Sequence, residues 1–268
     1  MTNDQYQSLL RGPILVIAGP CVIESAEICL AVAGPMKAVC ERLKLPYVFK
    51  ASFDKANRTS VGSFRGPGLE AGLKILARIK RELDVPVLTD VHETAQAAPA
   101  GQVVDVLQVP AFLARQTDLL AECGRTGRVV NIKKGQFMSP QEMANAVEKV
   151  RSTGNQRIWL TERGTFFGYN RLVNDLTGLA VMKETRCPVI FDATHSTQQP
   201  AGQGSASGGN PQFAPLLARA AVAAGFDGLF IECHPDPPRA LSDPATMLTL
   251  DQAQRVLEQC ARIASARG

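Results

Sequence analysis

The stretch from residue 188 to residue 235 contains PVIFDAT (188–194), FAPLLARAAVAAG (213–225) and GLFIECHP (228–235) in that order. The first and third segments are short runs rich in β-branched and other apolar residues, which is typical of buried strands. The middle segment places its apolar residues on one face of a helix. The stretch therefore predicts a strand, a helix and a second strand, the unit from which parallel sheets are built.

The same alternation extends over the rest of the chain. Six further strand-like runs are ILVIAGP (14–20), YVFKASF (47–53), PVLTDV (86–91), VLQVP (106–110), VVNIKK (129–134) and IWLTERG (158–164). Segments between them, such as 70–83, 140–154 and 250–264, again have one apolar face. Eight such units predict an α/β fold, a (β/α)8 TIM barrel in which residues 1–268 form a single catalytic domain.

An open, doubly wound sheet is the alternative arrangement of these units. Polar residues stand at the carboxyl end of almost every expected strand. They favour the barrel, because in a barrel these ends converge on one opening where catalytic groups collect.

Composition excludes several classes of protein. A net charge of +4 spread over 268 residues gives no basic stripe for nucleic acid. No apolar run approaches the roughly 20 residues of a membrane span, and the first residues lack the features of a signal peptide, so a cytoplasmic protein is expected. The seven cysteines form neither an even set nor close pairs, which indicates reduced thiols.

Charged and polar side chains gather at the expected strand ends. They are Cys21, Lys50, Ser52, Lys55, Asp90, His92, Gln108, Lys133, Lys134, Glu162, Arg163, Asp192, His195, Glu232 and His234. Cations at this density repel one another unless anions lie between them, so the set predicts a bound ligand with phosphate or carboxylate groups. Arg58, Thr59 and Ser60 in KASFDKANRTS (50–60) can complete a phosphate site. Any one of these residues could instead be a solvated strand end.

Cys21, His195, Glu232 and Asp243 supply a thiolate, an imidazole and two carboxylates from neighbouring strand regions. This mixed donor set suits Zn²⁺, Fe²⁺, Mn²⁺ or Co²⁺ better than Ca²⁺. Each residue also has a simpler explanation, such as a buried cysteine, a Glu–Lys pair or a helix cap at Asp243. His92 and His234 are alternative ligands, or residues that orient the ligands.

Eight motifs in this chain resemble the metal-dependent class of the 3-deoxy-D-manno-octulosonate 8-phosphate synthase family, from Ile14 to the C-terminus. They are AGPCVIES (18–25), KASFDKANRTS (50–60), TDVHE (89–93), LQVPAFLARQTDLL (107–120), NIKKGQF (131–137), TERGTFFGYN (161–170), FDATHSTQQP (191–200) and IECHPDPPRALSD (231–243). Cys21 stands where metal-independent members have asparagine. KANRTS differs from the KPRTSP-like sequence of the related heptulosonate synthases, which implies D-arabinose 5-phosphate rather than erythrose 4-phosphate as acceptor.

The resemblance implies a transferase of lipopolysaccharide precursor biosynthesis. It would condense phosphoenolpyruvate, arabinose 5-phosphate and water to 3-deoxy-D-manno-octulosonate 8-phosphate and inorganic phosphate. A bound metal could polarise the aldehyde or acidify the water, and we favour the positioning of both. Another synthase that uses phosphoenolpyruvate, of the heptulosonate or sialic acid type, is the nearest alternative. A catalytically silent barrel that binds sugar phosphates is the alternative from a different class.

The resemblance also assigns roles to individual residues. It places phosphoenolpyruvate on Ser52, Lys55, Lys133 and Arg163, with Lys50 nearby, and arabinose 5-phosphate on Asn57, Arg58, Thr59 and Asp90. It implies a homotetramer in which Phe112 and Arg115 reach the site of a neighbouring subunit. Gln108 is a further expected substrate contact, and Lys55, Lys133, His195 and Asp243 are the expected catalytic residues. The small residues of AGQGSASGGN (201–210) indicate a lid or an ordinary flexible loop.

Overall fold

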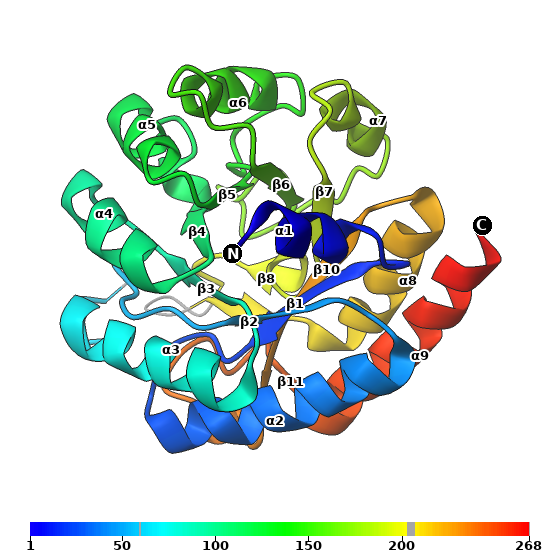
Figure 1. Ribbon diagram of the computed structural model, residues 1–268. Coiled ribbons are helices and arrows are strands. Elements are labelled where there is room, and N and C mark those ends of the chain that lie inside the picture. The colour runs from blue at the N-terminus through cyan, green and yellow to red at the C-terminus, as the bar shows by residue number, and fades with distance from the viewer. Residues whose placement is uncertain (59, 203–206, 268) are drawn as a thin grey trace.

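Eight parallel strands close into a barrel in the computed structural model, which describes residues 1–58, 60–202 and 207–267. Closure occurs because β1 pairs with both β2 and β10 (Figure 1). The barrel strands are β1 (Leu15–Gly19), β2 (Tyr47–Lys50), β3 (Val87–Asp90), β4 (Val106–Val109), β5 (Val129–Lys133), β6 (Ile158–Glu162), β7 (Val189–Asp192) and β10 (Gly228–His234). The barrel expected from the sequence is confirmed, and the open sheet is wrong.

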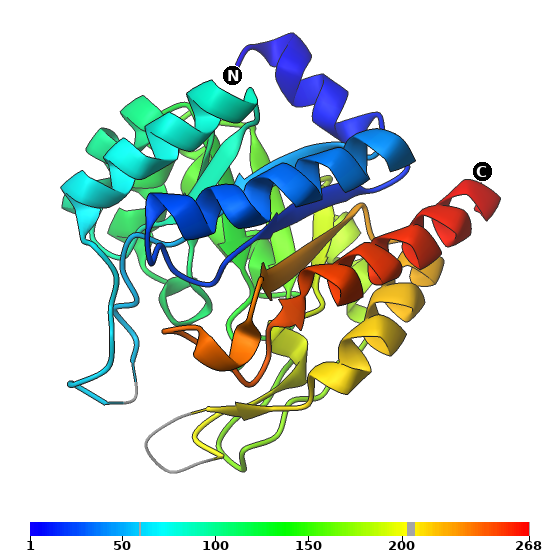
Figure 2. The same cartoon turned by 90° about the horizontal axis from the view of Figure 1, so that it is seen from below.

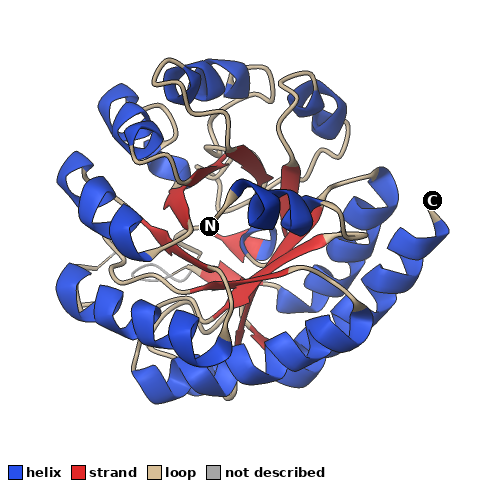
Figure 3. Cartoon of the chain, in the orientation of Figure 1, coloured by secondary structure: helices blue, strands red, loops and turns tan. Residues whose placement is uncertain are grey.

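Helices surround the strands as an outer ring (Figure 3). They are α2 (Ala26–Leu43), α3 (Leu69–Leu83), α4 (Thr94–Val103), α5 (Thr117–Arg125), α6 (Met143–Arg151), α7 (Gly178–Lys183), α8 (Ala214–Ala224) and α9 (Leu250–Ala266). In α3 the buried residues Leu73, Leu76 and Ile79 recur at helical spacing. The helices thus cover the outer face of the sheet through the apolar stripe that the sequence predicts.

The barrel interior is built in layers because alternate residues of each strand point inward. One layer is apolar and contains Ile17, Val48, Leu88, Val106, Val129, Trp159, Ile190 and Phe230. Two residues further along the same strands stand Gly19, Lys50, Asp90, Gln108, Asn131, Thr161, Asp192 and Glu232. The polar layer therefore rests on an apolar floor.

Helix α1 (Asn3–Leu10) closes the amino-terminal end of the barrel. Thr2 and Gln5 form a capping box at its start, and Tyr6 and Leu9 join the apolar floor. The Tyr6 ring stacks on Trp159 with 6.3 Å between ring centroids. Figure 2 shows α1 at one end of the molecule and the long loops at the other. This helix was not predicted from the sequence, because its residues are mostly polar.

Short elements surround the carboxyl-terminal opening. Strands β8 (Gln198–Gln199) and β9 (Gly208–Gly209) pair antiparallel, and β11 (Leu248–Thr249) extends alongside β10. Residues 203–206 of the expected lid lie outside the described residues, so the lid stays a prediction. No helix in the described ranges has the length and apolar content needed to cross a membrane.

Gly19 is the position where the barrel is least tolerant of a side chain. A Cβ built on Gly19 would lie 1.8 Å from the carbonyl oxygen of Lys50, a backbone atom of the neighbouring strand. We expect Gly19→Ala to lower the free energy of unfolding by about 3 kcal/mol, measured by urea denaturation, because β1 and β2 must separate. At Gly168 an added Cβ meets nothing within 4 Å, so Gly168→Ala should stay within about 0.5 kcal/mol of the parent. Equal stability of the two variants would contradict this packing.

Candidate active site

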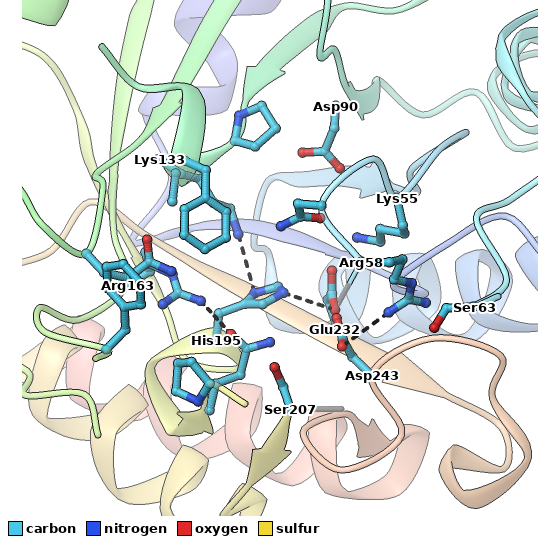
Figure 4. Close-up of a pocket in the computed structure, with 18 of the residues that line it drawn as sticks. Lys55, Arg58, Ser63, Asp90, Lys133, Arg163, His195, Ser207, Glu232 and Asp243 are labelled. Carbon is cyan, nitrogen blue, oxygen red and sulfur yellow. Dashed lines mark hydrogen bonds and ion pairs between the residues drawn. The ribbon is translucent and has the colours of Figure 1, made fainter. Parts of the chain in front are cut away.

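A cavity of about 530 Å³ opens at the carboxyl ends of the strands (Figure 4). Most of the site residues expected from the sequence line it: Lys50, Lys55, Asn57, Arg58, Asp90, Gln108, Phe112, Lys133, Arg163, His195, Glu232 and Asp243. They come from loops and strand ends around the barrel. The cavity, which His92 also lines, therefore gathers cations, carboxylates and two imidazoles in one place.

The other expected site residues lie elsewhere. Cys21 and Ser52 are buried behind the cavity wall, where the Ser52 hydroxyl donates a hydrogen bond to Asp90. Arg115 is exposed and lines a separate depression beside Lys149. Phe112 lines the cavity of its own chain, and its expected contact with a neighbouring subunit stays a prediction. Thr59 lies outside the described residues.

Lys50 and Glu232 form an ion pair in the polar layer, with Nζ and Oε1 2.5 Å apart. Both side chains are almost fully buried, and Lys50 also donates to the backbone oxygen of Cys21 at 2.8 Å. Burial alone would raise the pKa of Glu232, but the positive charge of Lys50 and of nearby cations outweighs it and lowers that pKa. Glu232 is therefore a carboxylate at neutral pH.

Asp192 connects Lys133 to His195. Lys133 donates to Asp192 and stands 3.5 Å from the centroid of the Phe230 ring. The same carboxylate lies 2.8 Å from Nδ1 of His195 and accepts a 2.8 Å hydrogen bond from the His195 backbone N–H. Because a carboxylate accepts, Nδ1 of His195 is the donor in this contact, and Nε2 faces Glu232. Burial lowers the pKa of Lys133 despite the attraction of Asp192.

Arg163 keeps most of its hydrogen-bonding capacity free. It is 4% exposed, and its Nη2 donates to Gln198 at 2.6 Å, while Nε and Nη1 have no hydrogen-bond partner among the described residues. Glu162 fixes the turn by accepting from the backbone N–H groups of Arg163 and Gly164 at 2.8 and 2.6 Å. Arg163 is thus held rigidly with unused donors, as an anion site requires.

Fewer cations of the site need a bound anion than the sequence suggested. Carboxylates of the protein already pair with Lys50, Lys133 and Arg58, the last at 3.6 Å from Asp243. Within the described part of the chain, neither Arg163 nor Lys55 forms an ion pair. Burial alone would lower the pKa of Lys55, but negative groups around it outweigh burial and raise that pKa. A bound anion is therefore needed mainly by Arg163, whose pKa burial lowers despite the nearby carboxylates, whereas negative groups of the protein already balance Lys55.

Donor atoms of Cys21, Glu232 and Asp243 all lie within 4.8 Å of one another. The Cys21 thiol donates to Asp243 at 3.2 Å, and burial, with the nearby carboxylates, raises the pKa of this thiol. Glu232 Oε2 has no hydrogen-bond partner in the described residues, and His195 Nε2 lies 3.5 Å from it. A cation bound here would give Glu232 Oε2 the partner that it lacks among the described residues. The donor set fits a divalent transition metal, which would displace the thiol proton.

Several residues that line the cavity were not predicted from the sequence. Gln136, Phe167 and Gln198 line the cavity but are uncharged, so a search for charged strand ends passes over them. All three stand inside quoted motifs, NIKKGQF, TERGTFFGYN and FDATHSTQQP, which was the available signal. Asp192 was noted as a strand-end charge, but its role became evident only from its contacts.

Proteins of known name align with this chain over most of its length. The sequence model described as the DAHP synthetase I family matches residues 11–266. The chain is 58% identical to the 2-dehydro-3-deoxyphosphooctonate aldolase of Granulibacter bethesdensis, over 92% of this chain and 88% of the relative. It is also 58% identical to the protein of that name from Koribacter versatilis, over 96% of this chain and 94% of the relative.

Asp192 provides a test of the buried charge arrangement. We expect Asp192→Asn to lower the free energy of unfolding by about 3 kcal/mol in urea denaturation, because Lys133 would remain buried without its counter-charge. Asp54→Asn is the matched control, since its partner Arg65 is 56% exposed, and it should change stability by at most about 1 kcal/mol. An Asp192→Asn protein as stable as the control would refute the assigned pairing.

Proposed function

The chain belongs to the DAHP synthetase I family, and from this premise we propose that it condenses phosphoenolpyruvate with D-arabinose 5-phosphate and water. The products are 3-deoxy-D-manno-octulosonate 8-phosphate, a precursor of lipopolysaccharide, and inorganic phosphate. The observation that carries this proposal is the 58% identity, over 96% of the chain, to a protein named 2-dehydro-3-deoxyphosphooctonate aldolase. The lining of the cavity supplies the charges that these two substrates need.

Phosphoenolpyruvate binds at the end of the cavity that contains Arg163, Lys133 and Lys55. Its phosphate and carboxylate supply the negative charge that Arg163 lacks in the protein itself, and Lys55 and Lys133 add positive charge at this end. The free Nε and Nη1 donors of Arg163 match the paired oxygens of such a group. Lys50 stays near this end, whereas Ser52 acts through Asp90, to which its hydroxyl is bonded.

Arabinose 5-phosphate occupies the remainder of the cavity. Arg58 lies near the outer opening, where it donates to the backbone oxygens of Phe64 and Leu241 at 3.1 and 3.3 Å. Its guanidinium, with Asn57 and Thr59, receives the acceptor phosphate. Asp90 and Gln108 lie deeper and accept or donate hydrogen bonds to the sugar hydroxyl groups. The two substrates therefore meet between Lys55 and His195.

The reaction joins C3 of phosphoenolpyruvate to the aldehyde carbon while water adds to C2. The aldehyde oxygen gains a proton, the water loses one, and cleavage of the C–O bond then releases inorganic phosphate. Lys133 and Arg163 stabilise the charge that develops on the departing phosphate, because both are buried and their side chains are held by Asp192 and Gln198. His195 and Asp243, which line the same cavity, are the residues to which we assign the orientation of the water and the aldehyde.

Cys21, His195, Glu232 and Asp243 would hold a divalent metal, with zinc, iron, manganese and cobalt as the candidates. When bound, it would supply positive charge that orients the water and the aldehyde. Support comes from the three donor atoms within 4.8 Å of one another and from the unpartnered Oε2 of Glu232.

We further propose a cytoplasmic homotetramer. Free, buried cysteines suit a reducing compartment. Phe112, Phe137, Phe166 and Tyr169 are 42, 47, 69 and 96% exposed, and they supply apolar surface that a second copy could cover. Arg115 is exposed and lines a depression outside the cavity, which supports a part for it in such a contact.

Release of inorganic phosphate tests the choice of acceptor. With phosphoenolpyruvate and a divalent metal, arabinose 5-phosphate should be consumed at least about tenfold faster than erythrose 4-phosphate, because the site is built around one sugar's hydroxyl groups. Faster turnover of erythrose 4-phosphate would instead identify a heptulosonate synthase. No phosphate release with either aldose would identify a binding protein without this activity.

Cys21 provides the test of the metal site. Cys21→Ser should reduce metal content in elemental analysis and lower kcat by about 100-fold, because a hydroxyl is a poor ligand in place of a thiolate. Cys260 in α9 is another buried cysteine, so Cys260→Ser is the matched control and should keep the metal content and kcat of the parent. Cys21→Asn should recover part of the activity without metal. A metal-free Cys21→Ser protein with full activity would overturn the assignment.

A further inference from the structure

A chain of hydrogen bonds crosses the interior of the barrel from β6 to β3. The Thr161 hydroxyl donates to Oδ1 of Asn131 at 2.8 Å, and Nδ2 of Asn131 donates to Oε1 of Gln108 at 2.8 Å. Nε2 of Gln108 then donates to Oδ1 of Asp90. Each residue stands on the strand next to the preceding one, so the chain spans four consecutive strands.

Every bond in this chain points the same way. Successive donors lead from a neutral hydroxyl, through two amides, to the Asp90 carboxylate, and bonds aligned in this manner strengthen one another. Ser52 donates to the other oxygen of Asp90. Both carboxylate oxygens are thereby fixed, and the orientation of Asp90 depends on groups that lie well away from it.

The two ends of the chain differ in their access to ligand. Asp90 and Gln108 line the cavity, whereas Asn131 and Thr161 do not line it and are 0% exposed. Valine would fit a barrel interior at far lower desolvation cost than asparagine or threonine. Polar residues at these two positions therefore call for a reason other than packing.

The orientation of the Gln108 amide supplies that reason. An amide has a donor end and an acceptor end, and only the orientation with Nε2 toward Asp90 avoids two acceptors facing each other. Asn131 enforces this orientation by donating to Oε1, and Thr161 holds Asn131 in turn. Without them, Gln108 can rotate, and Asp90 loses a donor.

We propose that Thr161 and Asn131 are positioning residues that set the affinity for the acceptor aldose through Gln108 and Asp90. This inference rests on the proposed function, in which those two cavity residues bind the hydroxyl groups of arabinose 5-phosphate. Asp90 also lies 4.0 Å from Lys50, but the side chains of Lys133 and Arg163, which receive phosphoenolpyruvate, are held by Asp192 and Gln198 instead. A defect in the chain should accordingly affect one substrate and spare the other.

Thr161→Val removes the first donor and preserves the shape of the side chain. We expect the KM for arabinose 5-phosphate to rise about tenfold while the KM for phosphoenolpyruvate changes less than about twofold. Thr161→Ser keeps a hydroxyl and should restore the parent value. Thr89→Val is the matched control, because the buried Thr89 hydroxyl has no hydrogen-bond partner among the described residues, and both KM values should stay unchanged.

The outcomes separate this inference from the function on which it rests. A Thr161→Val protein with reduced stability but unchanged KM values, or with both KM values raised equally, overturns the inference alone. If the parent protein releases no phosphate with arabinose 5-phosphate, the proposed function falls and the inference falls with it. Should Thr161→Val be insoluble, Thr161→Ala, which also lacks the hydroxyl and has a smaller side chain, decides the question through the same two KM values.

Discussion

Pairing of the first barrel strand with the last is the constraint from which the site follows. The register sets Gly19 of β1 opposite Glu232 of β10, so the residues just beyond Gly19 come next to the end of β10. Cys21 thereby reaches Glu232 although 211 positions of sequence separate them, and the segment after β10 returns Asp243 to the same place. Without this closure, neither the donor cluster nor the cavity could exist.

The layered interior explains how so much charge is tolerated. A carboxylate or ammonium group buried alone would be prohibitively costly, but each carboxylate in the polar layer contacts a cation or a set of hydrogen-bond donors. The apolar floor beneath keeps water from approaching from below. Ion pairs in such surroundings retain much of their strength, and they hold Lys50 and Lys133 in fixed positions for a ligand.

Strand order and the identity of most cavity residues could be predicted from the sequence, because short apolar runs and polar strand ends depend on local pattern alone. The ion-pair partner of each charged side chain could not be predicted in this way. Whether Glu232 meets Lys50 or Lys133 depends on side-chain conformations across the barrel, and the role of Asp192 depends on contacts with a loop that follows it. Thr161 and Asn131 were equally hidden, since only the register shows that they lie beside Gln108. Helix α1 escaped because two buried residues in a polar segment give a weak signal.

The packing of Tyr6 on Trp159 also has an optical consequence. Trp159 is the only tryptophan of the chain and lies in the floor, at the end of the barrel opposite the cavity. Indole emission thus monitors how α1 seals that end during denaturation, and it is remote from ligand exchange at the opening. Fluorescence therefore reports on the end of the barrel that α1 covers, and turnover reports on the end that contains the cavity.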